Sequence, residues 1–83
     1  MKKWYVYIVE CSDKTFYTGI STDVDKRIET HNKGRGAKYT KYKRPVTCVY
    51  SQEYENRSEA SKEEYRIKQL TKNEKKLLIY NKK

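Results

Sequence analysis

The chain has 83 residues, 35% hydrophobic and 37% charged, and its apolar residues cluster in short runs, which argues against disorder and against a second domain. Its 20 Lys and Arg residues outnumber its 11 Asp and Glu residues, and the net charge of +9 favours a polyanionic partner such as nucleic acid. The one histidine and two cysteines lack the spacing of zinc ligands, and no apolar run approaches a membrane span, so we expect a cytoplasmic domain with no zinc and no membrane partner.

Two strands are predicted at the start of the chain. Residues 4–11 are rich in aromatic and β-branched side chains on both alternating faces, which is typical of a strand covered on both sides. Residues 12–14 supply turn chemistry, and residues 15–20 form the returning strand. We therefore expect an antiparallel hairpin.

A helix is predicted over residues 23–33. Thr22 is the expected N-cap and Gly34 the expected stop. Within this helix Arg27 and His31 recur at the spacing of the apolar residues, so two polar side chains share the face that packs on the core.

The most basic window of the chain follows, at residues 35–44. It holds five Lys or Arg residues, two Tyr residues and no acidic residue. Pro45 closes it, and a third strand is predicted from Val46 to Tyr50 or slightly beyond.

Another helix is predicted to begin after Asn56, because Glu59 follows at the spacing of a helix start, and to run to about Leu70. Its buried stripe would consist of Ala60, Glu64 and Ile67. A carboxylate is thus expected among apolar neighbours.

The last predicted helix opens with a capping box formed by Thr71 and Glu74. It should run to about Tyr80, with Leu77 and Leu78 as its anchors on the core. The predicted fold is therefore α+β, with a three-stranded antiparallel sheet flanked by three helices in the order β-β-α-β-α-α. Residues 1–83 would form one domain with a compact core from about residue 3 to 80.

Several short strings resemble the GIY-YIG nuclease family. Tyr7 and Tyr17 lie ten positions apart in the strings YVY and YTG, and Arg27, His31 and Glu64 follow in the order that the family uses. The match extends over nearly the whole chain. It is most similar to the short, stand-alone bacterial members through residues 17–22, 36–40, 44–46, 64 and 67–68.

The sequence departs from the family pattern in three places. Tyr5 stands where many relatives carry Gly, and Thr18 stands where Ile or Val is usual. Residues 20–21 stand where some members place an active-site lysine, so Arg27 and the lysines of the basic window would have to supply that charge.

The resemblance implies a divalent-metal-dependent endonuclease that hydrolyses DNA phosphodiester bonds, with a structure-specific role in repair or recombination. By this resemblance Tyr17 acts as general base or orients the attacking water together with Tyr7, Arg27 stabilises the phosphate charge, and His31 assists. Free Tyr has a pKa of about 10, so Arg27 or a metal must lower it for base catalysis. Glu64 would be the single protein ligand of one Mg²⁺ or Mn²⁺ ion, since Mg²⁺ takes few carboxylates and keeps several waters.

The basic window is the expected nucleic-acid contact, because cations bind phosphates and tyrosine rings stack on bases. The candidate residues are Lys38, Tyr39, Lys41, Tyr42, Lys43 and Arg44. A DNA partner that is branched, nicked or single-stranded is compatible with such a surface.

Ordinary structural roles stay open on the residue pattern alone. The two tyrosines also fit cross-strand aromatic positions, Arg27, His31 and Glu64 fit ordinary helix positions, and the basic window fits a solvated loop. Two rival functions follow: a non-catalytic nucleic-acid-binding module with a GIY-YIG fold, or a small subunit whose basic face docks on an acidic protein.

Overall fold

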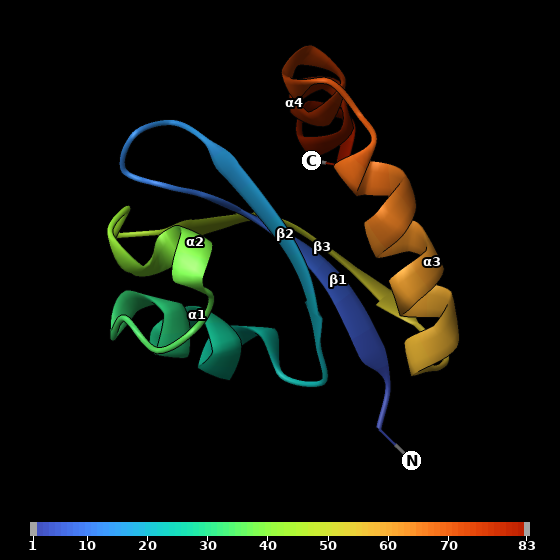
Figure 1. Cartoon of the computed structure of the whole chain (residues 1–83). Helices are drawn as coiled ribbons and strands as arrows, with labels where there is room; N and C mark the ends of the chain where they lie inside the picture. The colour runs from blue at the N-terminus through green and yellow to red at the C-terminus, as the bar shows by residue number, and fades with distance from the viewer. Residues whose placement is uncertain (1, 83) are drawn as a thin grey trace.

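The computed structural model describes residues 2–82, and side chains are described up to residue 81. Its centre is a three-stranded antiparallel sheet (Figure 1). Strand β1 (Trp4–Glu10) lies between β2 (Phe16–Ser21) and β3 (Thr47–Tyr54). The predicted α+β fold and the predicted hairpin of the first two strands are therefore confirmed.

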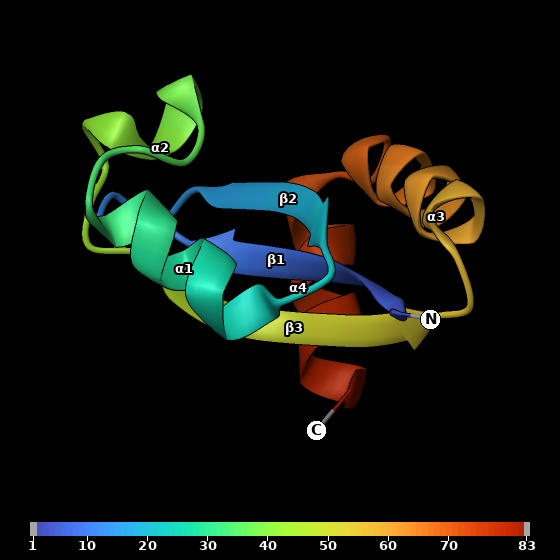
Figure 2. The same cartoon turned by 90° about the horizontal axis from the view of Figure 1, so that it is seen from below.

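Helices cover both faces of this sheet (Figures 1 and 2). The helix α1 (Val24–Asn32) and the single-turn helix α2 (Lys38–Lys41) lie on one side. The helices α3 (Arg57–Lys68) and α4 (Lys72–Lys82) lie on the other. None of the helices in the described residues is long and apolar enough to cross a bilayer.

The alternation of side chains along β1 divides the interior into two cores. Val6 and Ile8 point to the side of α3 and pack with Ala60 and Ile67 of that helix. The other core lies on the side of α1, and its buried members are Tyr7, Val9, Cys11 and Val46. Because β1 is covered on both faces, it reads as an almost continuous apolar run.

Two details of the chain around α1 differ from the expectation. The N-cap is Asp23 and not Thr22, because the Lys26 amide donates to the Asp23 carboxylate at 3.1 Å. Strand β3 extends to Tyr54, well past Tyr50, because its pairing with β1 continues to the first residue of that strand. The stop at Gly34 is confirmed by a left-handed φ of 80°.

The predicted three helices become four, because the basic window contains α2. Its four residues are too few to leave a periodic pattern in the sequence. The structure instead holds this turn through Thr40, which is fully buried against His31.

Both predicted helix starts in the last third of the chain are confirmed. The Asn56 side chain accepts from the Glu59 amide at 2.9 Å, and Thr71 and Glu74 form the reciprocal bonds of a capping box. The expectation for Leu77 was wrong, since this side chain is exposed. The neighbouring Leu78 packs on the core.

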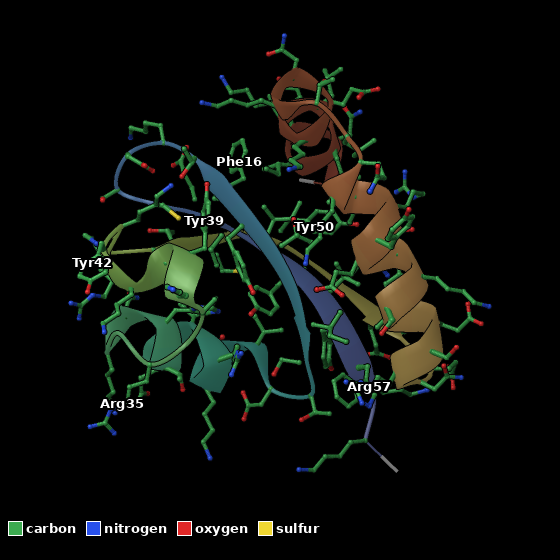
Figure 3. The ribbon with its side chains drawn as sticks, viewed as in Figure 1. Phe16, Arg35, Tyr39, Tyr42, Tyr50 and Arg57 are labelled. Atoms are coloured by element: carbon green, nitrogen blue, oxygen red, sulfur yellow. The ribbon has the colours of Figure 1, made fainter. Side chains whose placement is uncertain are left out.

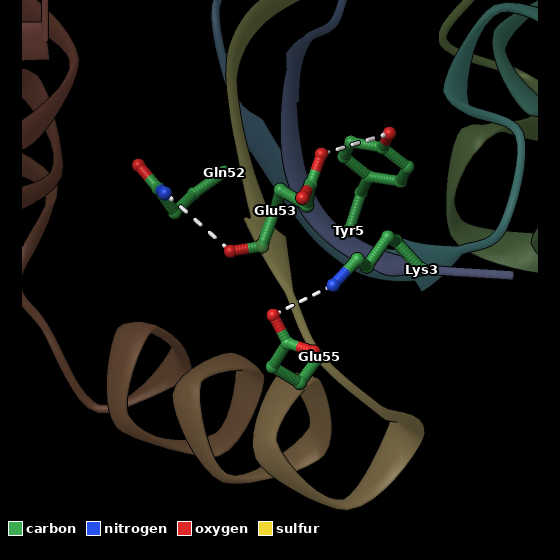
Figure 4. Close-up of polar contacts among 5 residues, drawn as sticks. All are labelled: Lys3, Tyr5, Gln52, Glu53 and Glu55. Atoms are coloured by element: carbon green, nitrogen blue, oxygen red, sulfur yellow. Dashed lines mark hydrogen bonds and ion pairs between the residues drawn. The ribbon is translucent and has the colours of Figure 1, made fainter. Parts of the chain in front are cut away.

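Polar contacts occupy the outer edge of the sheet along β3 (Figure 4). Lys3 pairs with Glu55 at 2.6 Å, and the Tyr5 hydroxyl donates to the Glu53 carboxylate at 3.3 Å. Tyr5 therefore contacts its direct cross-strand partner, at a position where many family members carry Gly. Charged side chains on an edge strand also discourage pairing with a second sheet.

The hydroxyl group of Thr18 is expected to lower the free energy of unfolding, because its buried oxygen has no hydrogen-bond partner among the described residues. The Thr18→Val variant keeps the shape of the side chain and removes this unsatisfied group. We expect its free energy of unfolding in urea to rise by about 1 kcal/mol. The exposed Thr47, changed in the same way, should change stability far less, and an equal or lower stability of Thr18→Val would contradict this interpretation.

Candidate active site

Tyr7 lies at the centre of β1 and is almost completely buried on the side of α1. Its cross-strand partner on β2 is Gly19. A Cβ atom at Gly19 would lie 2.6 Å from the Tyr7 hydroxyl oxygen, which is closer than real Cβ contacts allow. Gly19 therefore provides the space in which the Tyr7 hydroxyl lies.

His31 in the last turn of α1 contacts this hydroxyl. The Tyr7 oxygen and His31 Nε2 are 2.8 Å apart, and the imidazole is fully buried. On its other side, His31 Nδ1 lies 2.8 Å from the Thr40 hydroxyl oxygen. Gly36 allows this approach, since a Cβ atom there would lie 2.1 Å from Nδ1.

Arg27 lies one helical turn before His31 on α1. Burial raises the pKa of Tyr7, and the nearby positive charge of Arg27 lowers it by a smaller amount, so that the pKa is raised overall. The pKa of His31 is lowered, first by burial and then by the charge of Arg27, which favours a neutral imidazole.

The Nε atom of Arg27 is buried. It has no hydrogen-bond partner among the described residues. Arg27 also borders a pocket of about 210 Å³ that it shares with Lys26 at the start of α1. Because the guanidinium is permanently charged, Arg27 is suited to attract a phosphate group that enters this pocket.

Tyr17 of β2 contacts both His31 and Tyr39. Its ring meets the His31 imidazole edge-on at a centroid distance of 5.4 Å and stacks on Tyr39 at 5.8 Å. The ammonium group of Lys68 on α3 lies 6.0 Å from the Tyr17 ring centroid. Tyr17 is partly exposed, so solvent reaches it more readily than it reaches Tyr7.

Glu64 on α3 supplies the carboxylate. Its side chain is 23% exposed and pairs with Lys68 at 3.3 Å. It lies close enough to Tyr7 for its negative charge to raise the pKa of that hydroxyl. The half-buried position between Ala60 and Ile67 agrees with the predicted inward-facing carboxylate.

The donor set suits a hard cation held by few protein groups. No cluster of three or more Asp, Glu, His or Cys side chains occurs in the described part of the chain. A lone, partly exposed carboxylate fits Mg²⁺, which binds through one or two carboxylates and keeps several waters. Glu64 fits that requirement.

The basic window separates into exposed and internally bound side chains. Lys38 and Lys41 are exposed, and Tyr42 is 85% exposed with the Lys41 ammonium 5.5 Å from its ring centroid. Arg35, which the sequence analysis did not single out, projects from the same surface as Tyr42 (Figure 3). These four side chains line a shallow pocket of about 310 Å³ together with the backbone of residues 34–37.

The other three candidates in this window make contacts within the protein. The ring of Tyr39, labelled in Figure 3, stacks on Tyr17. The Lys43 ammonium group lies 3.9 Å from the centroid of the Tyr39 ring. Arg44 donates to the backbone carbonyl oxygens of Lys41 and Asn32 at 2.9 and 3.3 Å. Tyr39, Lys43 and Arg44 therefore shape the loop, whereas Lys38, Lys41 and Tyr42 face solvent.

The structure brings Tyr7, Tyr17, Arg27 and His31 into one cluster, with the charge of Glu64 nearby. It also adds Thr40, which the sequence analysis missed. The signal available for Thr40 was its place in residues 36–40, one of the strings similar to short bacterial family members.

Comparisons with known proteins show which family the chain is similar to. The family model described as "GIY-YIG catalytic domain" matches residues 3–77. UPF0213 proteins from Staphylococcus aureus strains Mu3 and N315 are each 54% identical to the chain over 79 residues, covering 95% of this chain and 96% of theirs.

Two solution NMR structures share the fold. A UPF0213 protein from Bacillus halodurans is 42% identical with a TM-score of 0.63, covering 96% of this chain and 85% of that one. A protein from E. faecalis is 38% identical with a TM-score of 0.63, covering 100% of this chain and 91% of that one. The chain therefore belongs to the GIY-YIG family of nuclease domains and is similar to its short UPF0213 members.

Proposed function

We propose that this protein is a divalent-metal-dependent endonuclease that hydrolyses phosphodiester bonds in DNA. The supporting observation is the half-buried Arg27, which borders a pocket at the start of α1 and whose positive charge acts on the Tyr7 hydroxyl. A permanent cation in a polar cluster is what an anionic transition state requires.

Arg27 is the electrostatic group of the reaction in this proposal. Its guanidinium is always charged, and its planar fork can donate to two oxygens of one phosphate. Its Nε is buried, whereas the residue as a whole is half-buried and borders the pocket at the start of α1, where a substrate phosphate would meet it. Arg27 thus stabilises the charge that develops on the non-bridging oxygens.

Tyr17 is the tyrosine placed to meet the attacking water. Tyr7 is nearly inaccessible and bonded to His31, whereas Tyr17 is partly exposed. The Lys68 ammonium group lies 6.0 Å from the centroid of its ring and adds a positive charge beside it. Tyr17 therefore orients the water or accepts its proton, and Tyr7 and His31 position Arg27.

Glu64 would hold the metal ion, which when bound would supply Lewis-acid polarisation of the phosphate. The protein's own contribution there is a carboxylate fixed on α3 and flanked by Lys68. Lys68 also lies 6.0 Å from the centroid of the Tyr17 ring, so it brings a second positive charge to the cluster.

A panel of labelled branched, nicked, single-stranded and duplex DNAs tests the proposal. Cleavage of at least one member with Mg²⁺ or Mn²⁺, and none with a chelator, is the expected result. Salt-dependent binding of the panel without cleavage under any metal would instead favour the non-catalytic binding module. Failure to bind any member, with or without metal, would reject both functions.

The exposed lysines of the basic window are expected to contact DNA phosphates. Changing Lys38 and Lys41 to Ala should weaken binding and reduce the slope of log Kd against log salt by about 1.5 to 2, since each duplex phosphate contact contributes about 0.9. Fluorescence anisotropy at several salt concentrations, in chelator, measures this slope. The same double change at Lys72 and Lys76 on α4 is the control, and an equal loss of slope in both variants would argue against a localised contact.

A further inference from the structure

We propose that Thr40 is a positioning residue that orients the buried Tyr7–His31 pair and thereby makes the basic window part of the active centre. Thr40 lies in α2, between Lys38 and Lys41, and its side chain is fully buried. Its hydroxyl contacts both His31 Nδ1 at 2.8 Å and the Ala37 carbonyl oxygen at 3.0 Å.

The direction of the hydrogen bonds starts from the Tyr7 hydroxyl. This side chain is 1% exposed, so its proton must find an acceptor inside the protein. Among the described residues, His31 Nε2 lies within hydrogen-bond distance of the Tyr7 oxygen, at 2.8 Å. His31 Nε2 therefore accepts from Tyr7.

This direction fixes the tautomer of the imidazole. A neutral His31 that accepts at Nε2 carries its proton on Nδ1. That proton is donated to the Thr40 oxygen at 2.8 Å, and Thr40 donates its own proton to the Ala37 carbonyl at 3.0 Å. The Ala37 amide lies 3.3 Å from Nδ1 but does not donate to it in this arrangement, because Nδ1 carries a proton.

The result is a chain of hydrogen bonds in one direction, from Tyr7 through His31 and Thr40 to the carbonyl of Ala37. Such chains polarise their members cooperatively. Thr40 and Ala37, the last two members, belong to the basic window. A DNA strand bound by Lys38 and Lys41 can therefore act on the orientation of the Tyr7 hydroxyl. This catalytic consequence rests on the nuclease function proposed above, but the direction of the bonds does not.

Nitrogen NMR of the histidine ring tests the direction, since His31 is the one histidine in the chain. Protein labelled with ¹⁵N-histidine should show Nδ1 protonated and Nε2 unprotonated at neutral pH. The Thr40→Val variant keeps the side-chain shape but removes the acceptor, so Nδ1 should turn to the Ala37 amide and the proton should move to Nε2. A wild-type ring protonated at Nε2 would overturn the proposal.

A conservative variant separates positioning from folding. Thr40→Ser should restore the wild-type tautomer, because it keeps the hydroxyl, whereas the exposed Thr47→Val should leave the ring signals unchanged. In the cleavage assay Thr40→Val should lower kcat about tenfold with little change in KM, since one buried hydrogen bond is lost. Thr40→Ser should recover most of that loss.

The two proposals fail in different ways. If no DNA is cut, the NMR still decides whether Thr40 orients the Tyr7–His31 pair, and the nuclease function alone is rejected. If DNA is cut and Thr40→Val switches the tautomer without lowering kcat, Thr40 has no positioning role in the reaction.

Discussion

Arg27→Ala is expected to lower kcat for DNA cleavage by about 10²–10³-fold, the usual effect of removing one preorganised donor from a transition state. The loss should be larger in kcat than in DNA affinity, because most of the proposed phosphate contacts lie in the basic window. Single-turnover cleavage and anisotropy on the same substrate separate the two quantities. Arg27→Lys should recover little activity, because an ammonium group lacks the planar fork.

The control for Arg27 is its neighbour Lys26, which is exposed on the same helix. Lys26→Ala removes one positive charge without touching Tyr7, so its effect on kcat should be small. If both variants lost activity equally, general attraction between the protein and DNA would explain the loss. A placed guanidinium would then not be needed.

Glu64→Gln is expected to abolish most of the metal-dependent activity, about a thousandfold in kcat, because an amide is a weak ligand for Mg²⁺ and several kcal/mol of charge stabilisation are lost. Binding of DNA in chelator should persist. The free energy of unfolding should fall by less than about 1 kcal/mol, since the lost ion pair with Lys68 is partly exposed.

A matched change on the same helix is Glu59→Gln, which removes an exposed carboxylate paired with Lys62. This variant should cut DNA at the wild-type rate. In metal titrations Glu64→Gln should require a higher metal concentration than the wild type, whereas Glu59→Gln should require the same concentration. Full activity of Glu64→Gln at the wild-type metal concentration would remove Glu64 from the proposed metal site.

Local signals explain which parts of the fold were predictable. Asn56 and Thr71 cap helices through side-chain bonds that span three residues, so their chemistry is visible in the sequence. Thr22 and Asp23 are both good N-caps, and the choice between them depends on where the chain leaves β2. Which of Leu77 and Leu78 is buried depends on how α4 docks, which is a property of the tertiary structure.

The site was predictable to the extent that it follows helix periodicity or the family motifs. Arg27 and His31 share a face because they are four residues apart, and this follows from the sequence alone. The contact between Tyr7 and His31 joins residues 24 positions apart, and its distance depends on how α1 packs on the sheet. Thr40 was missed because threonine has many roles and α2 is held by this same contact.

The buried side chains on the α1 side of the sheet have a further consequence. Tyr7, His31 and Thr40 are among the least exposed side chains of the molecule, so the polar cluster and the interior of that half are made of the same atoms. In larger enzymes a site can be altered while a separate hydrophobic interior maintains the structure. Here, docking α1 and α2 on the sheet and assembling the reactive cluster are one cooperative event.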